Sequence, residues 1–213
     1  MRKRLATILA ASGAVALTLS LSTTSVLAVT AKTWTVTPGG TLSGKSTKTV
    51  LTDTVTGAVL TCKTSTATGT AKSGSGLTNP LATISATTFG KCTGPAGLTF
   101  KVTTSAFPWD LNGTKYTASS GLTKGTITGI HAVLTGTNSS CTATVDGTSA
   151  TADNGKVDAT HKNSAPTKLN VVPTGGNLHA YNVSNCLGAL NNGDATTYKA
   201  TYTLTTGQTI TSP

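Results

Sequence analysis

Four cysteines constrain this chain more than any other feature of its sequence. Cys92 and Cys186 sit in the same pattern: an apolar residue, two others, cysteine, one other and glycine (FGKCTG and VSNCLG). Each follows a second cysteine that lies in a Thr-rich stretch, Cys62 in the first case and Cys141 in the second. This arrangement predicts two similar halves, each closed by one disulfide.

Four cysteines allow three connectivities, and the repeat favours Cys62–Cys92 and Cys141–Cys186. The alternative is a zinc site, which normally needs cysteines and histidines spaced as CxxC or CxxH, and this chain has no such spacing. We therefore expect two disulfides and neither a metal nor a cofactor. Disulfides persist in oxidising compartments, so the pairing also predicts an exported protein.

Residues 1–28 have the organisation of a secretory signal peptide. Three basic residues follow Met1, residues 5–21 are mostly apolar, and Ala28 offers a cleavage site. The alternative is a transmembrane anchor, but this run is short of the roughly 20 apolar residues that a span requires. Residues 29–213 are expected to form a single secreted β domain. It would be extracellular or loosely attached to the cell surface, without membrane insertion.

The composition favours strands over helices. The chain has 49 threonines, 23 glycines and no glutamate. Threonine fits the pleated surface of a sheet, whereas glycine weakens helix interiors. Alternating polar and apolar stretches between turn residues predict about ten to eleven strands. The expected fold is all-β, an antiparallel β-sandwich or barrel-like fold whose two halves share one core. The polar residues 64–79 and 149–166 are expected to be loops or edge strands.

The charge balance is basic. Removing the three basic residues of the signal peptide from a net charge of +10 leaves +7, carried by thirteen Lys against six Asp. A nucleic-acid-binding protein normally clusters its charge and uses Arg, whereas here the Lys are spread from Lys32 to Lys199 and Arg is absent. We therefore expect no nucleic-acid partner. Solvated Lys side chains that protect sheet edges are the simplest interpretation, and weak attraction to an anionic cell-wall polymer is the alternative.

No catalytic set emerges from the motifs. A serine hydrolase needs Ser, His and a carboxylate in one constellation, and the chain contains no GxSxG motif. Of its three histidines, His131 and His179 fall in strand-like stretches and His161 in a polar one. An enzyme is therefore the less favoured interpretation. The alternative kept open is a secreted hydrolase of unrecognised type that uses His131 or His179 with an Asp.

The most aromatic segment, residues 107–116, is the best candidate for ligand binding. Its candidate residues for stacking on a sugar ring and bonding its hydroxyls are Trp109, Asp110, Asn112 and Tyr116. The alternative, which we favour, is that Trp109 and Phe107 fill a core that is poor in large side chains. The exposure of Trp109 distinguishes the two.

The order of turn and cysteine motifs resembles a group of small secreted actinomycete proteins. The similar segments are WTVTPGG near Trp34, FGKCTGPAG around Cys92, WDLN at Trp109 and GGNLHAYNVSNCLG ending at Gly188. The resemblance implies an exported all-β fold with two disulfides, and it carries over no catalytic residue. The function expected from all these features is non-enzymatic binding of an extracellular or cell-surface ligand, such as a cell-wall polymer or a glycan.

Overall fold

A computed structural model describes residues 32–213, so the expected signal peptide, residues 1–28, lies outside the described residues. The described chain is all-β, with fifteen strands, two short 3-10 turns and no α-helix. The strands are β1 (Trp34–Thr37), β2 (Gly40–Ser46), β3 (Thr49–Asp53), β4 (Val59–Ala71), β5 (Gly74–Leu77), β6 (Ala82–Thr93), β7 (Thr99–Ser105), β8 (Trp109–Thr117), β9 (Leu122–Gly136), β10 (Thr142–Asp146), β11 (Gly155–Lys162), β12 (Lys168–Val172), β13 (His179–Ser184), β14 (Thr196–Leu204) and β15 (Thr209–Thr211). Residues 32–213 contain no helix long and apolar enough to cross a bilayer.

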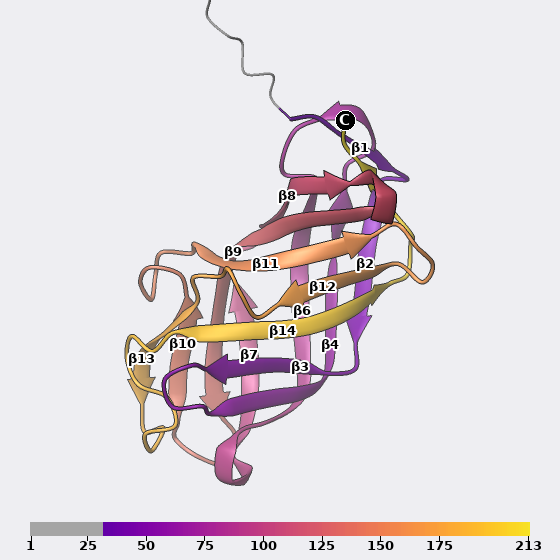
Figure 1. Ribbon diagram of the computed structural model, residues 1–213. Coiled ribbons are helices and arrows are strands. Elements are labelled where there is room, and N and C mark those ends of the chain that lie inside the picture. The colour runs from indigo at the N-terminus through magenta and orange to yellow at the C-terminus, as the bar shows by residue number, and fades with distance from the viewer. Residues whose placement is uncertain (1–31) are drawn as a thin grey trace, which may run out of the picture. The chain divides into compact units, whose positions relative to one another are not determined.

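Twelve of the strands form one antiparallel sheet that closes on itself. The order β11-β12-β14-β2-β4-β6-β7-β9 becomes a ring because β11 also pairs with β9. In Figure 1, β9, β11, β12 and β14 cross in front of β2, β4, β6 and β7. Layers that cross steeply are typical of orthogonal sheet packing, in which long strands turn the corners. The expected antiparallel, barrel-like fold is confirmed.

The two longest strands join the two layers. Along one edge, β4 pairs first with β3 and then with β2. Similarly, β9 pairs with β8 and β11 in its first part and with β7 and β10 in its second part. Each of these strands therefore belongs to both layers, and the inward side chains of both layers fill one shared interior.

Both predicted disulfides are confirmed. Cys62 and Cys92 lie directly opposite each other on β4 and β6, and Cys141 and Cys186 join the ends of the paired strands β10 and β13. All four sulfurs lie in the same core cluster. Each half of the chain contributes a continuous arc of the ring, β2 to β8 and then β9 to β14, so the halves share one core as expected.

A separate three-stranded sheet, β15-β1-β5, brings the two ends of the described chain together. Its core is Trp34 and Val36, each 1% exposed, packed with Leu81. Trp34 approaches β8 so closely that a Cβ on Gly113 would lie 2.6 Å from the indole ring. Glycine at this position is therefore what lets the small sheet pack against the ring of strands.

Two polar stretches expected to be loops or edge strands are more ordered than predicted. The stretch at residues 64–79 contains most of β4, which pairs on both sides, and β5. The stretch at residues 149–166 contains β11, an internal strand that closes the ring. Its inward residues are Gly155, Val157, Ala159 and His161. This inward set is small and includes a histidine, so its alternation carries little hydrophobic signal.

Candidate functional site

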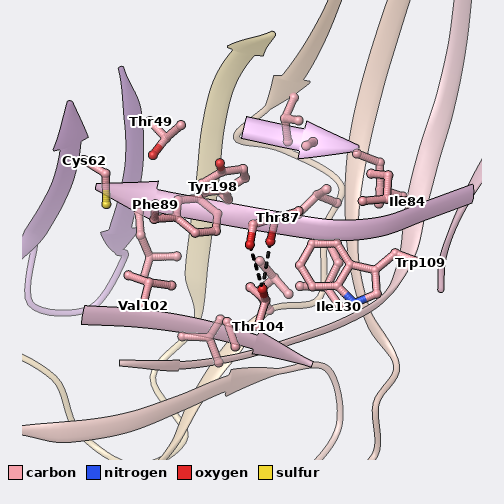
Figure 2. A pocket seen from close by; sticks show the side chains of 18 of the residues that line it. Thr49, Cys62, Ile84, Thr87, Phe89, Val102, Thr104, Trp109, Ile130 and Tyr198 are labelled. Atoms are coloured by element: carbon pink, nitrogen blue, oxygen red, sulfur yellow. Dashed lines mark hydrogen bonds between the residues drawn. The ribbon is translucent and has the colours of Figure 1, made fainter. Parts of the chain in front are cut away.

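Trp109, the centre of the expected glycan site, is buried. It is 6% exposed, its indole N–H donates to the Ser105 carbonyl at 2.9 Å, and its ring stacks on Phe107 with centroids 4.9 Å apart. Its side chain points into the interior between the two layers (Figure 2). Trp109 therefore fills the core, as in the alternative stated above, and its face is not available to a sugar.

The other three residues of that segment do not join Trp109 on one surface. Asp110 and Asn112 alternate with it along β8 and so project from the opposite side of the strand. The Asn112 amide lies 3.3 Å from the Thr128 hydroxyl. Tyr116 packs against the small core under Trp34. A ligand role for Asp110 and Asn112 stays a prediction.

The interior that Trp109 enters contains an apolar cavity of about 90 Å³. Ile84 and Ile130 lie beside Trp109 at one end, and Phe89 and Val102 lie toward the other (Figure 2). The hydroxyls of Thr87 and Thr104, which also line it, bond each other at 2.8 Å. The polar groups of this cavity are thus partnered, and its surface suits only apolar atoms.

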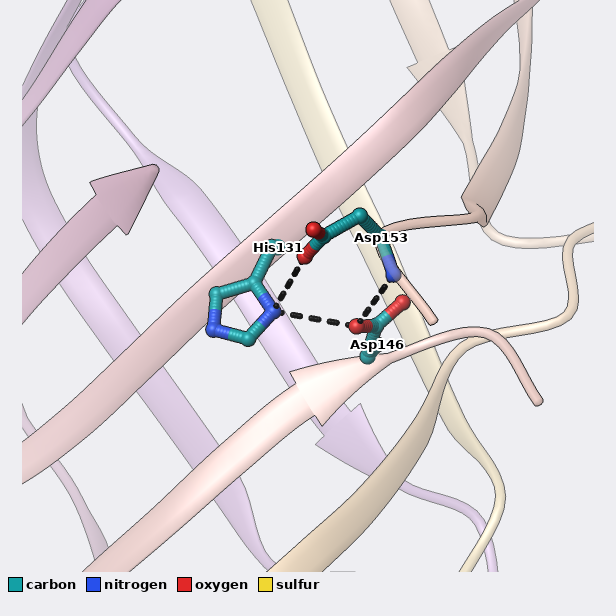
Figure 3. A group of neighbouring side chains, drawn as sticks. All are labelled: His131, Asp146 and Asp153. Carbon is teal, nitrogen blue, oxygen red and sulfur yellow. Dashed lines mark hydrogen bonds and ion pairs between the residues drawn. The ribbon is translucent and has the colours of Figure 1, made fainter. Parts of the chain in front are cut away.

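Within residues 32–213, a histidine and two aspartates place a ring nitrogen and two carboxylate oxygens within 4.8 Å of one another (Figure 3). Nδ1 of His131 on β9 lies 3.0 Å from Oδ2 of Asp146 at the end of β10. The same nitrogen lies 3.1 Å from Oδ1 of Asp153. Asp146 is fully buried, whereas the Asp153 side chain is 55% exposed. This cluster tests the alternative hypothesis of a hydrolase that uses His131 with an aspartate.

Asp146 anchors the turn that leads from β10 to β11. Its Oδ1 accepts backbone N–H groups of Gly147, Asn154 and Gly155 at 2.6–3.1 Å, and its Oδ2 accepts that of Asp153 at 3.0 Å. Burial by itself would raise the pKa of Asp146, but the hydrogen bonds that it accepts, led by that from Gly147, lower this pKa below its usual value. The carboxylate therefore stays ionised and acts as the centre of the turn.

The strand register places Ser105, His131, Asp146 and His179 in one row across β7, β9, β10 and β13. This is the order of residues in a Ser-His-Asp triad. In residues 32–213, however, no hydroxyl bonds the second nitrogen of His131, and His179 Nδ1 faces backbone carbonyls. A metal at the three side chains of the cluster would compete with the N–H groups that already occupy Asp146. The arrangement therefore fits a structural clamp best.

Replacing Asp146 with alanine should lower the free energy of unfolding by about 2 kcal/mol, because four backbone N–H groups lose their acceptor. Asp153→Asn is the matched control: it removes the charge of the exposed partner of the same histidine and keeps a residue type that tolerates the φ of 50° at this position, so we expect a loss below about 0.5 kcal/mol. Urea unfolding of both variants measures the difference. Equal losses would show that Asp146 does not anchor the turn.

A larger surface feature lies on the outer side of β8, β9, β11, β12 and β14. Residues directly opposite each other in a sheet project from the same face. In one row, Lys162 lies opposite Lys168, and Thr203 joins Lys168 to Lys45 on β2. The next row along the same strands contains Lys115 opposite Lys124, followed by Thr160, Asn170 and Thr201. Neither row contains an aspartate.

These rows border a groove of about 450 Å³. Four lysines line it, Lys45, Lys48, Lys168 and Lys199, together with hydroxyl-bearing residues. The two rows contain five lysines, and Lys199 lies on the same outward side of β14, two residues before Thr201. We call these six lysines the lysine face: Lys45, Lys115, Lys124, Lys162, Lys168 and Lys199. Two aspartates lie in the next rows of the same outer side: Asp158, two residues from Thr160, is opposite Thr126 and Val172, and Asp110 is opposite Thr128.

The lysine face could not be predicted from the spacing of Lys along the chain. The Lys are evenly spaced along the chain, but the strand register gathers six of them on one side of the ring. The sequence did contain a signal for this clustering of lysines. The short connection between β8 and β9 sets Lys115 opposite Lys124, and the one between β11 and β12 sets Lys162 opposite Lys168.

Comparison with known proteins adds no relative: no protein-family model, curated protein or solved structure matches the chain. No activity is therefore carried over from another protein. The functional inference rests on the lysine face, the His131 cluster and the cavities, and of these the lysine face is the exposed feature with the clearest chemical preference.

Proposed function

We propose that the protein is exported and binds an anionic polymer of the cell wall through the lysine face. The main support for this proposal is that two pairs of lysines lie directly opposite each other on neighbouring strands, Lys162 with Lys168 and Lys115 with Lys124. In residues 32–213 no Lys forms an ion pair with an Asp, and the ion pairs there are those of His131. Like charges placed directly opposite each other destabilise a sheet. A bound chain of anionic groups would relieve this repulsion.

The geometry of a sheet supports a polymeric rather than a single-ion partner. Neighbouring strands lie about 4.8 Å apart, so the two opposed lysines in each row present adjacent cations to the same partner. Thr160, Asn170 and Thr201 continue the row that begins with Lys115 and Lys124. The Thr201 hydroxyl donates to Oδ1 of Asn170 at 2.9 Å, which leaves the Asn170 amide nitrogen and the Thr160 hydroxyl to bond polar groups of the same polymer. The expected export to the cell exterior, together with the resemblance to secreted actinomycete proteins, favours a wall polymer with phosphodiester or carboxylate groups.

A nucleic acid is the competing polyanion, and the surface chemistry disfavours it. Single-stranded nucleic acids are normally held by aromatic stacking as well as charge, and specific duplex contacts favour Arg. The two rows of the lysine face contain neither residue type. The binding experiment therefore includes DNA as a separate arm, and preference for DNA over wall polymer would overturn this choice of partner.

Replacing Lys162 and Lys168 with glutamine should weaken binding to isolated cell walls about tenfold or more, since a lysine near an anionic surface contributes about 1 kcal/mol. The matched control is Lys91→Gln with Lys101→Gln, which makes the same charge change on β6 and β7. Co-sedimentation with walls before and after removal of phosphodiester or carboxylate polymers identifies the anion. Equal weakening in both double variants would show that net charge, and not the lysine face, drives binding.

A further inference from the structure

A second cavity, of about 60 Å³, lies where the small sheet meets the ring of strands. Val36 of β1 and Ile210 of β15 line it on one side, and Ile127 and Leu169 line it on the other. Its surface is mostly apolar. Several polar residues also line this cavity, and three of them have buried side chains that distinguish it from the larger one.

These side chains are Thr123, His161 and Gln208, which are only 4%, 6% and 4% exposed. Thr123 and His161 lie opposite each other on β9 and β11. Within residues 32–213, the Thr123 hydroxyl, both ring nitrogens of His161 and both amide atoms of Gln208 have no hydrogen-bond partner. Buried polar groups are almost always hydrogen-bonded, so this concentration of unpartnered atoms in one cavity indicates a ligand.

The chemistry of the three groups defines what such a ligand must offer. Gln208 and Thr123 can both donate and accept, and a neutral imidazole does the same with its two nitrogens. Burial lowers the pKa of His161 to about 4, so the ring is neutral at pH 7. No Lys or Asp lines the cavity. A charged ligand would therefore be buried without a counter-ion, whereas a hydroxyl or an amide matches all three groups.

Ile127 and Leu169 line both this cavity and the larger one, so these two side chains form a wall that the cavities share. The polar groups of the larger cavity are already partnered: the Tyr202 hydroxyl bonds those of Tyr198 and Ser65, each at 2.9 Å. The volumes of about 90 and 60 Å³ together approach the roughly 150 Å³ of an engineered apolar cavity that holds benzene. The interior thus has a polar end and an apolar end, sized for about six non-hydrogen atoms.

We propose that the interior binds a small neutral amphiphile, a short-chain alcohol or primary amide. Its polar head would bond His161, Gln208 and Thr123 in the smaller cavity. Its apolar tail would pass between Ile127 and Leu169 into the larger cavity toward Trp109. This binding site is separate from the lysine face, which lies on the outer side of the same strands.

Titration of the full-length chain, produced with export so that both disulfides form, with 1-pentanol tests the proposal. We expect a saturable shift of the His161 imidazole signals in a ¹H–¹⁵N NMR correlation, with the signals assigned by their loss in His161→Leu. Pentanoate, which carries a charge, and n-pentane, which has no polar head, should each bind at least tenfold more weakly than 1-pentanol, because the buried polar groups would stay unpaired.

The variant Gln208→Leu separates head-group recognition from simple filling of space. It should weaken 1-pentanol at least tenfold and leave n-pentane binding unchanged. If Gln208→Leu failed to fold, comparing 1-pentanol, pentanoate and n-pentane on the unaltered chain would still show whether the polar head is recognised. The proposal is overturned if 1-pentanol leaves the His161 signals in place, if n-pentane or pentanoate binds equally well, or if crystals soaked in 1-pentanol contain only water in the cavity.

Discussion

Replacing Cys141 and Cys186 together with alanine should lower the free energy of unfolding by about 4 kcal/mol. The bridge closes 45 residues, and restricting a loop of that length in the unfolded chain is worth about 4 kcal/mol on the chain-entropy model. Both cysteines are also buried, at 1% and 3% exposure. Few large aromatic side chains support this core, since the whole chain has three Phe and two Trp. The disulfide should therefore provide a large part of the stability.

Urea unfolding of the double alanine variant measures this effect. The second bridge closes 30 residues in a separate part of the chain, so the two contributions should add. Full reduction, which keeps the sulfur atoms in place, should then cost about 7 kcal/mol, against a typical total stability of 5–15 kcal/mol. If the double variant and the reduced protein both stayed within about 1 kcal/mol of the oxidised protein, the disulfides would not be the main staples of the fold.

Acidification from pH 6.5 to pH 4 should cost about 3 kcal/mol through His161 alone. Its folded pKa is about 4, lowered by burial from an ordinary value of 6.5. Between these two pH values the unfolded chain binds a proton that the folded chain excludes. The free energy of unfolding therefore decreases as the pH is lowered, by up to about 1.4 kcal/mol per pH unit. Above about pH 7.5, where the imidazole is neutral in both the folded and the unfolded chain, this histidine should contribute almost no pH dependence.

His161→Leu provides the control, because it removes the titrating group and keeps an apolar filling. Urea unfolding at several pH values should give a flatter profile for this variant between pH 4 and 6.5. The lowered pKa of Asp146 acts in a different window: its stabilisation is present above the ordinary value of 3.8 and is lost as pH falls through its folded pKa. Parallel profiles for the unaltered chain and His161→Leu would contradict the burial of a neutral His161.

The sequence was sufficient for the fold class and the disulfide pairing. Turn residues and alternation mark strands locally, and the cysteine repeat reduces three connectivities to one. The sequence did not predict the number of strands, which is fifteen and not ten to eleven. Threonine is found on both the inward and the outward face of a sheet, so it does not show which residues of a strand point inward. β11 shows this: its outward side is Lys156, Asp158, Thr160 and Lys162, and its inward side is equally inconspicuous.

The functional features depend on which strands become neighbours, and this could not be predicted from local pattern. The sequence left two interpretations of Trp109, core filling and sugar binding, and closure of the ring, which turns its side of β8 inward, decides for the core. His161 lay in a polar stretch expected to be loop or edge, yet its register with Thr123 and Leu169 places it inside. The lysine face likewise follows from register between strands, while the even spacing of Lys along the chain suggested the opposite.

The most direct test of the lysine face is the salt dependence of binding to isolated cell walls. For electrostatic binding, the logarithm of the affinity falls linearly with the logarithm of salt concentration, and each lost contact lowers the slope by about one. We predict steep salt dependence for the unaltered chain, a slope smaller by about two for Lys162→Gln with Lys168→Gln, and little change for Lys91→Gln with Lys101→Gln. Absence of binding at low salt, or binding that is insensitive to salt, would contradict the account.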